Sequence, residues 1–169
     1  MSQSLEHFLD QVARRGSRFG GGSVSALSAA LAAALLEKLV GSSGATRRLR
    51  RMRRACIKLI QRDAEVFARV VAASRAGDYH AFQRSLKAAT EVPCQVFEHA
   101  QAIRAACRAA AKSIKPQFQS DLKSARAMAV AAAESARVLM ETNLAWLDNR
   151  TYTKAVRLRL RTALQRDAF

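Results

Sequence analysis

The sequence predicts an all-α fold, and three features of its composition support this prediction. Half of the 169 residues are hydrophobic, yet only 6% are aromatic and only two are proline. Alanine supplies much of the apolar content; it is the strongest helix former, and its small side chain lets helices pack closely. The length suits one domain with a sizeable core. We therefore expect residues 1–169 to form a single bundle of six to seven helices, with long alanine-rich helices at its centre.

The first expected helix spans residues 4–15, and the second begins at Ser23 and runs to about residue 40. In the first helix, apolar residues recur at steps of three and four: Leu5, Phe8, Leu9 and Val12. The second helix carries a stripe of larger apolar residues among its alanines: Val24, Leu27, Leu31 and Leu35. Both patterns follow the helical period. Because the second helix can be approached from several sides, we expect it to be central, within the domain or between subunits.

Four polar or glycine-containing breakers divide the rest of the chain: residues 41–44, 77–78, 112–116 and 148–151. Thr46 is placed to cap the helix that follows the first breaker. Ser120 is placed to cap the long alanine-rich helix that follows the third breaker. Between the second and third breakers we expect a short helix and then another that Pro93 begins or kinks. The last segment is a basic amphipathic helix.

Three consecutive glycines before the second helix form the motif with the clearest chemistry. Gly20, Gly21 and Gly22 leave their backbone N–H groups exposed, and Ser23 can cap the helix that begins there. The loop thus offers donors and a positive helix end to a carboxylate or phosphate. The alternative is a flexible connector. The G-x-x-x-x-G-K-[ST] fingerprint of nucleotide sites does not occur in the sequence.

Two polar residues interrupt apolar helix stripes. Asp63 lies on the core-facing stripe of the third helix. A carboxylate there is either paired with an arginine or lies in a cleft where its pKa is tuned for proton transfer. Asn143, on the apolar face of the long alanine-rich helix, needs hydrogen-bond partners from a ligand or a neighbouring helix. Ser120 and Asp121 begin that helix, where a cap and an acid also suit the dipole.

The formal net charge is +16, from 29 basic and 13 acidic residues. It favours an anionic partner: a polyanionic small molecule, an acidic protein or a nucleic acid. The densest basic cluster opens the third helix, against its dipole. This cluster is either a solvated face or an anion-binding surface. The candidate contacts are Arg47, Arg48, Arg50 and Arg51.

Other kinds of site find little support. The three cysteines are an odd number without C-x-x-C spacing, so we expect them to be reduced and buried. The three histidines do not share metal-ligand spacing, and we expect no metal site. Residues 24–40 are interrupted by serines and charged residues, so we expect no membrane span. A cytoplasmic location is the expectation.

An ordered set of motifs extends over nearly the whole chain: Phe8-Leu9, residues 20–27, residues 63–67, residues 89–93, Ser120-Asp121, Asn143-Leu144 and Asp148. In this order they resemble the formiminotetrahydrofolate cyclodeaminase / methenyltetrahydrofolate cyclohydrolase family. The resemblance implies an all-α homodimer that binds folate in a cleft where the subunits meet. It also implies chemistry, without a metal, on the one-carbon unit between N5 and N10 of tetrahydrofolate.

The resemblance also implies roles for individual residues. Asp63 would be the acid/base or electrostatic group beside a cationic carbon. Arginines near the site would hold the anionic glutamate tail of the folate. The residues that match folate-binding positions are Gly20, Gly21, Gly22 and Ser23, with Ser120, Asp121 and Asn143 as further candidates.

Three departures from the family pattern leave two functions open. Phe19 stands where the family has proline, Leu139 where it has asparagine, and residues 41–54 replace a segment with a Gly-Lys-Lys-Tyr-like stretch. The first function is a folate one-carbon enzyme, either a methenyltetrahydrofolate cyclohydrolase or a formiminotetrahydrofolate cyclodeaminase, which the glycine loop and Asp63 favour. The alternative is a non-catalytic, strongly basic subunit of the same fold that docks on an acidic protein or a nucleic acid.

Overall fold

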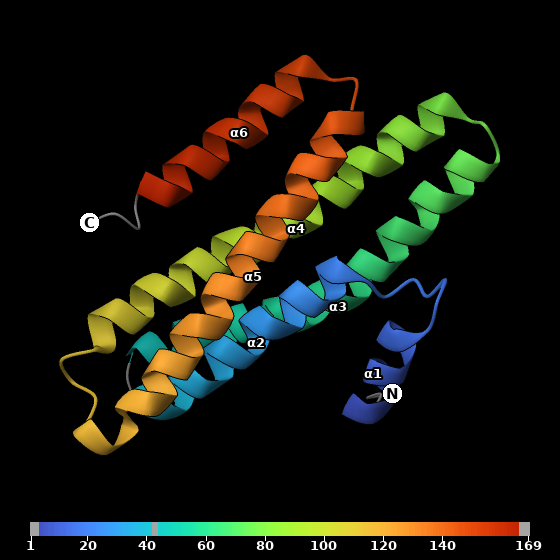
Figure 1. The fold of residues 1–169 in the computed structure, drawn as a ribbon. Helices are drawn as coiled ribbons and strands as arrows, with labels where there is room; N and C mark the ends of the chain where they lie inside the picture. Colours follow the sequence, from blue (N-terminus) through green and yellow to red (C-terminus); the bar gives the residue numbers. More distant parts are fainter. Residues whose placement is uncertain (1–3, 42–43, 166–169) are drawn as a thin grey trace.

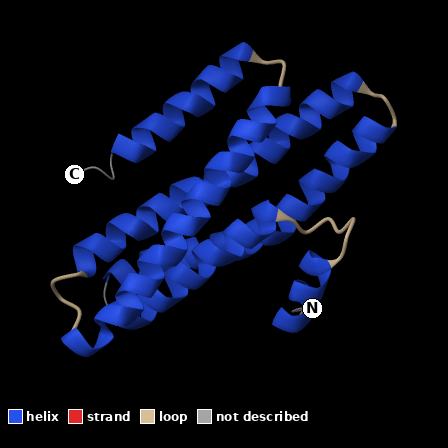
Figure 2. Ribbon diagram, in the orientation of Figure 1, coloured by secondary structure: helices blue, strands red, loops and turns tan. Residues whose placement is uncertain are grey.

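The computed structural model describes residues 4–41 and 44–165. Within these residues the chain forms six α-helices and one short 3-10 helix, without a strand (Figures 1 and 2). In chain order they are α1 (Leu5–Ala13), α2 (Gly21–Val40), α3 (Gly44–Arg75), α4 (Tyr79–Ala110), the 3-10 helix η1 (Pro116–Phe118), α5 (Gln119–Trp146) and α6 (Arg150–Gln165). The predicted all-α fold of six to seven helices is confirmed.

Four long helices form the bundle, with α2 and α4 each packed between α3 and α5 (Figure 1). The core-facing side of α2 is made of small residues, among them the fully buried Ala26, Ala29 and Ala33. Facing alanines on α5 let the two helices pack closely. The prediction that alanine-rich helices are central is confirmed. Of the larger apolar side chains of α2, Leu36 is fully buried, whereas Val24 is 42% and Leu31 50% exposed.

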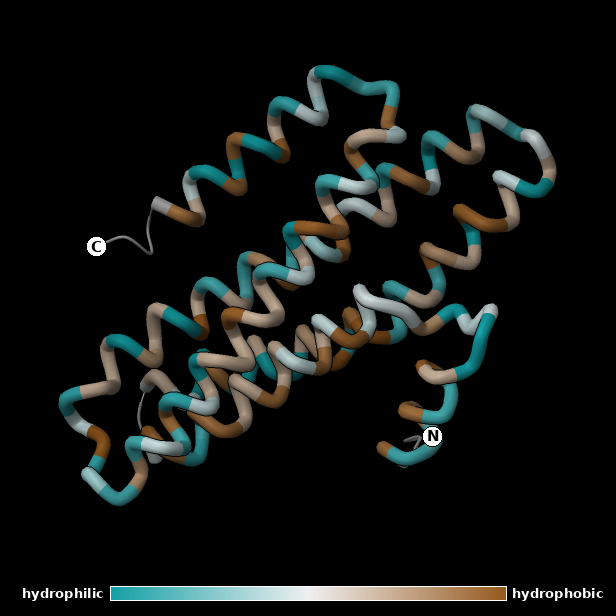
Figure 3. Tube along the Cα trace, in the orientation of Figure 1, coloured by the Kyte–Doolittle hydropathy of each residue, from teal (hydrophilic) through white to brown (hydrophobic). Residues whose placement is uncertain are grey.

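The apolar composition of α2 has a structural explanation (Figure 3). By length and composition alone this helix would be able to cross a membrane, with a mean hydropathy of 1.6 over its most apolar window. The sequence analysis expected this segment to be too polar to span a membrane, and its composition does not support that reason. In the structure α2 contacts α3, α4 and α5 at once, and 44% of this window is buried inside the bundle.

Three helices begin earlier than the sequence predicted. α2, α3 and α5 start before the expected capping residues Ser23, Thr46 and Ser120, which therefore lie inside the helices. Gly20 occupies the N-cap position of α2, and no side chain bonds to this helix start from there. The prediction that Ser23 caps α2 is wrong because its hydroxyl group is bonded to α3 instead.

The loop after α2 ends the helix as predicted. Gly41 has a φ of 62°, a left-handed conformation that glycine adopts without strain. The hydroxyl group of Thr46 donates a hydrogen bond to the Gly41 carbonyl group, which connects the start of α3 to the end of α2. Ser42 and Ser43, the rest of the predicted breaker, lie outside the described residues.

α4 is one continuous helix of 32 residues, although a separate short helix was expected before Pro93. The Asp78 carboxylate caps its start by accepting a hydrogen bond from the backbone N–H of Ala81, at 2.8 Å. Pro93 lies buried inside α4, where its ring nitrogen has no hydrogen to donate to the carbonyl group of Ala89. The prediction of a separate short helix is wrong, because packing of α4 on α3 and α5 outweighs the local preference of proline.

α1 is attached to the bundle by a small core of its own. Phe8 is its one buried residue, and the Phe8 ring meets the Phe19 ring edge to face, with 5.5 Å between centroids and 71° between planes. Ala64 of α3 completes this core. The aromatic pair therefore holds α1 beside the glycine loop and α3.

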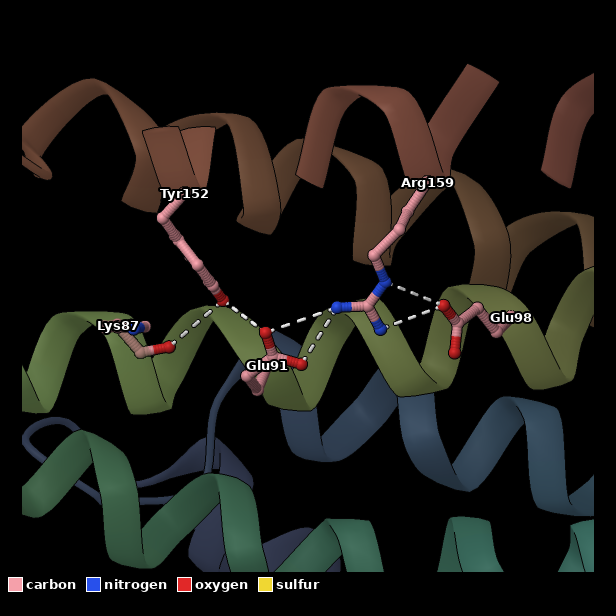
Figure 4. A network of polar contacts seen from close by, with 5 residues as sticks. All are labelled: Lys87, Glu91, Glu98, Tyr152 and Arg159. Carbon is pink, nitrogen blue, oxygen red and sulfur yellow. Dashed lines mark hydrogen bonds and ion pairs between the residues drawn. The ribbon is translucent and has the colours of Figure 1, made fainter. Parts of the chain in front are cut away.

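α6 lies along α4 and is fastened by one polar network (Figure 4). The Arg159 guanidinium group reaches Glu91 at 3.1 Å and Glu98 at 2.9 Å. The Tyr152 hydroxyl group donates a hydrogen bond of 2.5 Å to Glu91. Beside this network Val156 is buried against the bundle, so α6 is held by both polar and apolar contacts.

Candidate functional site

A contact between the first turn of α2 and the middle of α3 is the centre of the candidate site. The Ser23 hydroxyl group lies 2.8 Å from Oδ2 of Asp63 and 3.1 Å from the carbonyl oxygen of Ile60, both of which can accept its hydrogen. A Cβ atom on Gly22 would overlap the same carboxyl group, at 2.5 Å from its Cγ and 2.8 Å from its Oδ2. Gly22 is thus needed for Asp63 to approach the helix start.

Asp63 is partly buried, and its surroundings favour a neutral carboxyl group more than water does. Burial raises the pKa of Asp63 above its ordinary value of 3.8, and hydrogen bonds from the Ser23 hydroxyl and backbone amide oppose this rise. Among the described residues Asp63 forms no ion pair, so the structural ion pair that the sequence left open is not found. A carboxyl group with a raised pKa is suited to receive and return a proton.

A cavity of about 320 Å³ opens beside Asp63, between the start of α2, the middle of α3, the first half of α4 and the end of α5. One wall is apolar and includes Val66, Leu86 and Pro93. The polar groups at the cavity come from the glycine loop and from a few side chains: Arg18, Asp63, Thr142 and Asn143. An apolar wall with a few converging polar groups is typical of small-molecule sites.

The structure brings five of the predicted site residues together around this cavity and adds a sixth through Asp63. The lining residues are Gly20, Gly21, Gly22, Asp63 and Asn143, and Ser23 reaches the site by its bond to Asp63. Ser120 and Asp121 lie elsewhere, because Asn143 is 22 residues further along α5, about 33 Å along the helix axis. Asp121 is paired with Lys38, at 3.6 Å.

The arginine cluster lies at the other end of α2, about 27 Å along that helix from Gly22. Arg50 and Arg53 form ion pairs with Glu37 at 2.8 Å and 2.9 Å, and these bonds lower the pKa of Glu37. Arg50, which was predicted as a contact for an external anion, connects α3 to α2 through this ion pair. Arg47, Arg48 and Arg51 are exposed.

A larger cavity of about 670 Å³ lies at this second end, between the end of α2, the start of α3 and the end of α4. Its lining is mostly apolar and includes Leu49, Met52 and Ile114. Among the described residues that line it, Arg48 is the one with a charged side chain, and none carries a carboxyl or amide group. It therefore offers less chemistry than the cavity beside Asp63.

Sequence reasoning missed three groups at the smaller cavity. Arg18 lines it directly before the glycine loop, and its guanidinium carbon lies 5.4 Å from the centre of the Phe19 ring. Phe67, 48% exposed, lines it from α3. The carbonyl group of Ala89 faces the absent N–H of Pro93, and both residues line the cavity. The position of Arg18 beside the loop, and the proline four residues after Ala89, were signals for two of them.

The departures at Phe19 and Leu139 have structural counterparts. Phe19 is 5% exposed and packs on Phe8. Its burial fixes the chain before the glycine loop, as the restricted backbone of a proline would do at this position. The methyl groups of Leu139 lie 3.6 and 3.7 Å from the position of a Cβ atom on Gly21. α5 therefore presents hydrocarbon, in place of an amide, to the start of α2.

The thiol groups lie in the core. Cys56, Cys94 and Cys107 are buried and form no disulfide, as predicted. Burial raises the pKa of Cys56 and of Cys94 to about 12 and that of Cys107 to about 11, which makes these thiols poor nucleophiles. Within residues 4–41 and 44–165 no group of three or more His, Cys, Asp or Glu side chains is placed to hold a metal ion.

Comparisons with known proteins agree with the resemblance seen in the sequence. The chain is similar to the crystal structure of formiminotetrahydrofolate cyclodeaminase from Thermotoga maritima, with a TM-score of 0.90 and 23% sequence identity over 98% of this chain and 90% of that one. This likeness establishes the fold. No protein of curated function matches the chain. The sequence profile of the formiminotransferase-cyclodeaminase family matches residues 4–162. The chain therefore belongs to the formiminotransferase-cyclodeaminase family.

Proposed function

We propose that the cavity beside Asp63 binds a reduced folate and that the protein acts on the one-carbon unit between N5 and N10 of tetrahydrofolate. The reaction is that of a methenyltetrahydrofolate cyclohydrolase or of a formiminotetrahydrofolate cyclodeaminase. One observation carries the proposal: the Asp63 carboxyl group, whose pKa is raised by burial, is held at the glycine-rich start of α2 in a ligand-sized cavity. Membership of the family supports it.

Asp63 supplies the chemistry that both reactions need. In the cyclodeaminase reaction N10 attacks the formimino carbon, and Asp63 takes a proton from N10 and returns one to the departing ammonia. In the cyclohydrolase reaction Asp63 takes a proton from the water that attacks the methenyl carbon. The bond from that carbon to N5 then breaks, N5 takes up a proton as the new hydroxyl group loses one, and a formyl group remains on N10. In both, its negative form stabilises the positive charge on that carbon. The hydrogen bond from Ser23 fixes the carboxyl group in one orientation.

The remaining groups of the cavity account for recognition. The apolar wall of Val66, Leu86 and Pro93 suits the flat pteridine ring. The Asn143 amide and the Ala89 carbonyl group can pair with ring donors and acceptors. Arg18 is the cation that lines this cavity, and it suits the carboxylates of the glutamate part. The arginine cluster is too far from the cavity of the same protomer for this role.

The exposed apolar side chains of α2 support a homodimer. Val24 and Leu31 are 42% and 50% exposed on a helix whose other faces are packed. Exposed apolar rows of this kind are covered in oligomers. A second copy seated on this face would give the subunit junction that the resemblance implies.

The test is turnover of two matched carboxylate variants, followed by the absorbance of the methenyl bridge. Asp63→Asn keeps the size of the side chain but cannot transfer the proton, so we expect turnover to fall by about 100-fold or more. Asp121→Asn, at the far end of α5, is the control and should stay within about twofold of the wild type. Equal turnover in the two variants would refute the role of Asp63. No turnover in the wild type would refute the enzyme.

A further inference from the structure

The outer face of α3 carries a row of cations that the folate site does not use. Arg47, Arg51, Arg54 and Lys58 follow one another at steps of four, three and four residues. On a helix this spacing places them on one face, over about 16 Å of its length. All four are exposed. We refer to these four residues as the α3 row.

Within residues 4–41 and 44–165 no acidic side chain neutralises the α3 row. Glu37 is engaged by Arg50 and Arg53, which lie on the side of α3 that faces α2. Glu65, the next acidic residue along the outer face, pairs with Arg62 at 3.5 Å. In the described part of the chain the four residues of the α3 row form no hydrogen bond or ion pair through their side chains. Their charges are therefore available to an external partner.

The α3 row does not serve the stability of the fold. Arg47 lies in the first turn of α3, where the positive end of the helix dipole disfavours a cation, and this turn contains no acidic residue. Like charges four residues apart, such as Arg47 and Arg51, also repel each other. A second copy of the chain seated on this face would meet the same charges, so the row does not fit the dimer contact.

We propose that the α3 row binds the phosphate backbone of a duplex nucleic acid, without reading its sequence. Three of its four residues are arginines, whose guanidinium groups bind phosphate in a two-point fashion. Single strands are held largely by stacked aromatic side chains, and residues 47–58 contain none. A membrane surface would need apolar side chains to insert, and Ile57 is the one large exposed apolar residue in this segment. The net charge of +16 adds long-range attraction.

The size of the effect follows from the number of contacts. Four neutralised phosphates give a slope of about −3.6 for the logarithm of the association constant against the logarithm of salt concentration. Raising the salt fourfold should then weaken binding about 150-fold. In a protein that has lost these four contacts, this face should contribute almost nothing to the slope of the association constant against salt concentration.

The chain contains a matched control for this surface. Arg150, Lys154, Arg157 and Arg161 of α6 have the same residue types, the same steps of four, three and four, and the same exposure. Alanine at all four positions of either row lowers the net charge by the same amount. Removing cations from the start of α3 also relieves repulsion, so the α3 variant should fold.

The experiment is fluorescence anisotropy of the full chain with a labelled duplex DNA and a duplex RNA of mixed sequence, at several salt concentrations. We expect both duplexes to bind, the four-alanine α3 variant to lose at least 30-fold in affinity with a shallower salt slope, and the α6 variant to stay within about threefold of the wild type. A smaller pair, Arg51→Gln with Arg54→Gln against Arg157→Gln with Arg161→Gln, should repeat this order.

Equal losses in the α3 and α6 variants would overturn the proposal, because net charge alone would then explain binding. Tighter binding to anionic lipid vesicles or to polyglutamate than to either duplex would also overturn it, in favour of a membrane or an acidic protein. The result is independent of the folate proposal, since no residue of the α3 row lines the cavity beside Asp63.

Discussion

Alanine at the third glycine of the loop is the substitution to which the candidate site should be most sensitive. A Cβ atom at Gly22 would lie 2.5 Å from Cγ of Asp63, so the carboxyl group has to rotate away. It then loses its hydrogen bonds from the Ser23 hydroxyl and backbone amide. The first two glycines provide controls. A Cβ atom at Gly20 would meet nothing within 4 Å, and one at Gly21 would meet Leu139 at an ordinary 3.6 Å.

The expected loss can be worked from these contacts. Two hydrogen bonds to a charged group contribute about 3–6 kcal/mol together. Hydration of the displaced carboxylate in the open cavity, and the higher helix propensity of alanine, offset part of this. We expect Gly22→Ala to lower the free energy of unfolding by about 2–3 kcal/mol, or the melting temperature by about 5–10 °C. Gly20→Ala and Gly21→Ala should stay within about 1 kcal/mol of the wild type.

Thermal and urea unfolding, followed by circular dichroism of the helices, measure these differences directly. The order of the three variants matters more than any single value, because all three make the same chemical change. If Gly22→Ala unfolds at the same temperature as Gly20→Ala, the Asp63 carboxyl group does not lie against the start of α2, and the described geometry of the site is refuted.

Three further predictions concern other parts of the molecule. Tyr152→Phe removes the hydroxyl donor of Glu91, and we expect a loss of about 1 kcal/mol in urea unfolding; no change would mean that the bond is not formed in solution. Leu31→Glu places a charge on the face of α2 that the proposed homodimer covers; light scattering should show a dimer mass for the wild type and half of it for the variant, and equal masses would contradict this contact. Because the pKa of Asp63 is raised, the folded state holds its proton more tightly than the unfolded state. The wild type should therefore lose stability relative to Asp63→Asn as pH rises above about 4, and a constant difference between pH 4 and 7 would contradict this.

Local sequence signals predicted the helices well and their ends less well. Alanine content and apolar spacing were sufficient for the all-α fold, and Gly41 ends α2 as its lack of a Cβ atom suggested. Pro93 was misleading, because the cost of one missing hydrogen bond inside α4 is offset by its packing on two neighbours. The sequence also did not show which face of α2 is buried. Alanines and Leu36 face the core, whereas Val24 and Leu31 of the apolar stripe are exposed.

The sequence predicted those site residues whose type is unusual for their position in the chain. Asp63 stood out as a carboxylate on an apolar stripe, and Gly22 as part of a glycine run. Their mutual contact joins positions 41 residues apart, and no local pattern encodes it. For the same reason the sequence could not place Ser120 and Asp121 away from Asn143, although all three are on one helix. Arg50 likewise carried no sign that Glu37 would engage it.

Calorimetric titration with 5-formyltetrahydrofolate measures whether a reduced folate binds in the cavity beside Asp63. Val70 lines the cavity, so Val70→Trp should fill it, whereas Leu158→Trp on the exposed face of α6 is a control of equal size. We predict binding by the wild type and by the control, and its loss in Val70→Trp with the helical spectrum retained. Equal binding by all three proteins would mean that folate binds outside this cavity, and no binding by the wild type at high micromolar folate would mean that the protein has no folate site.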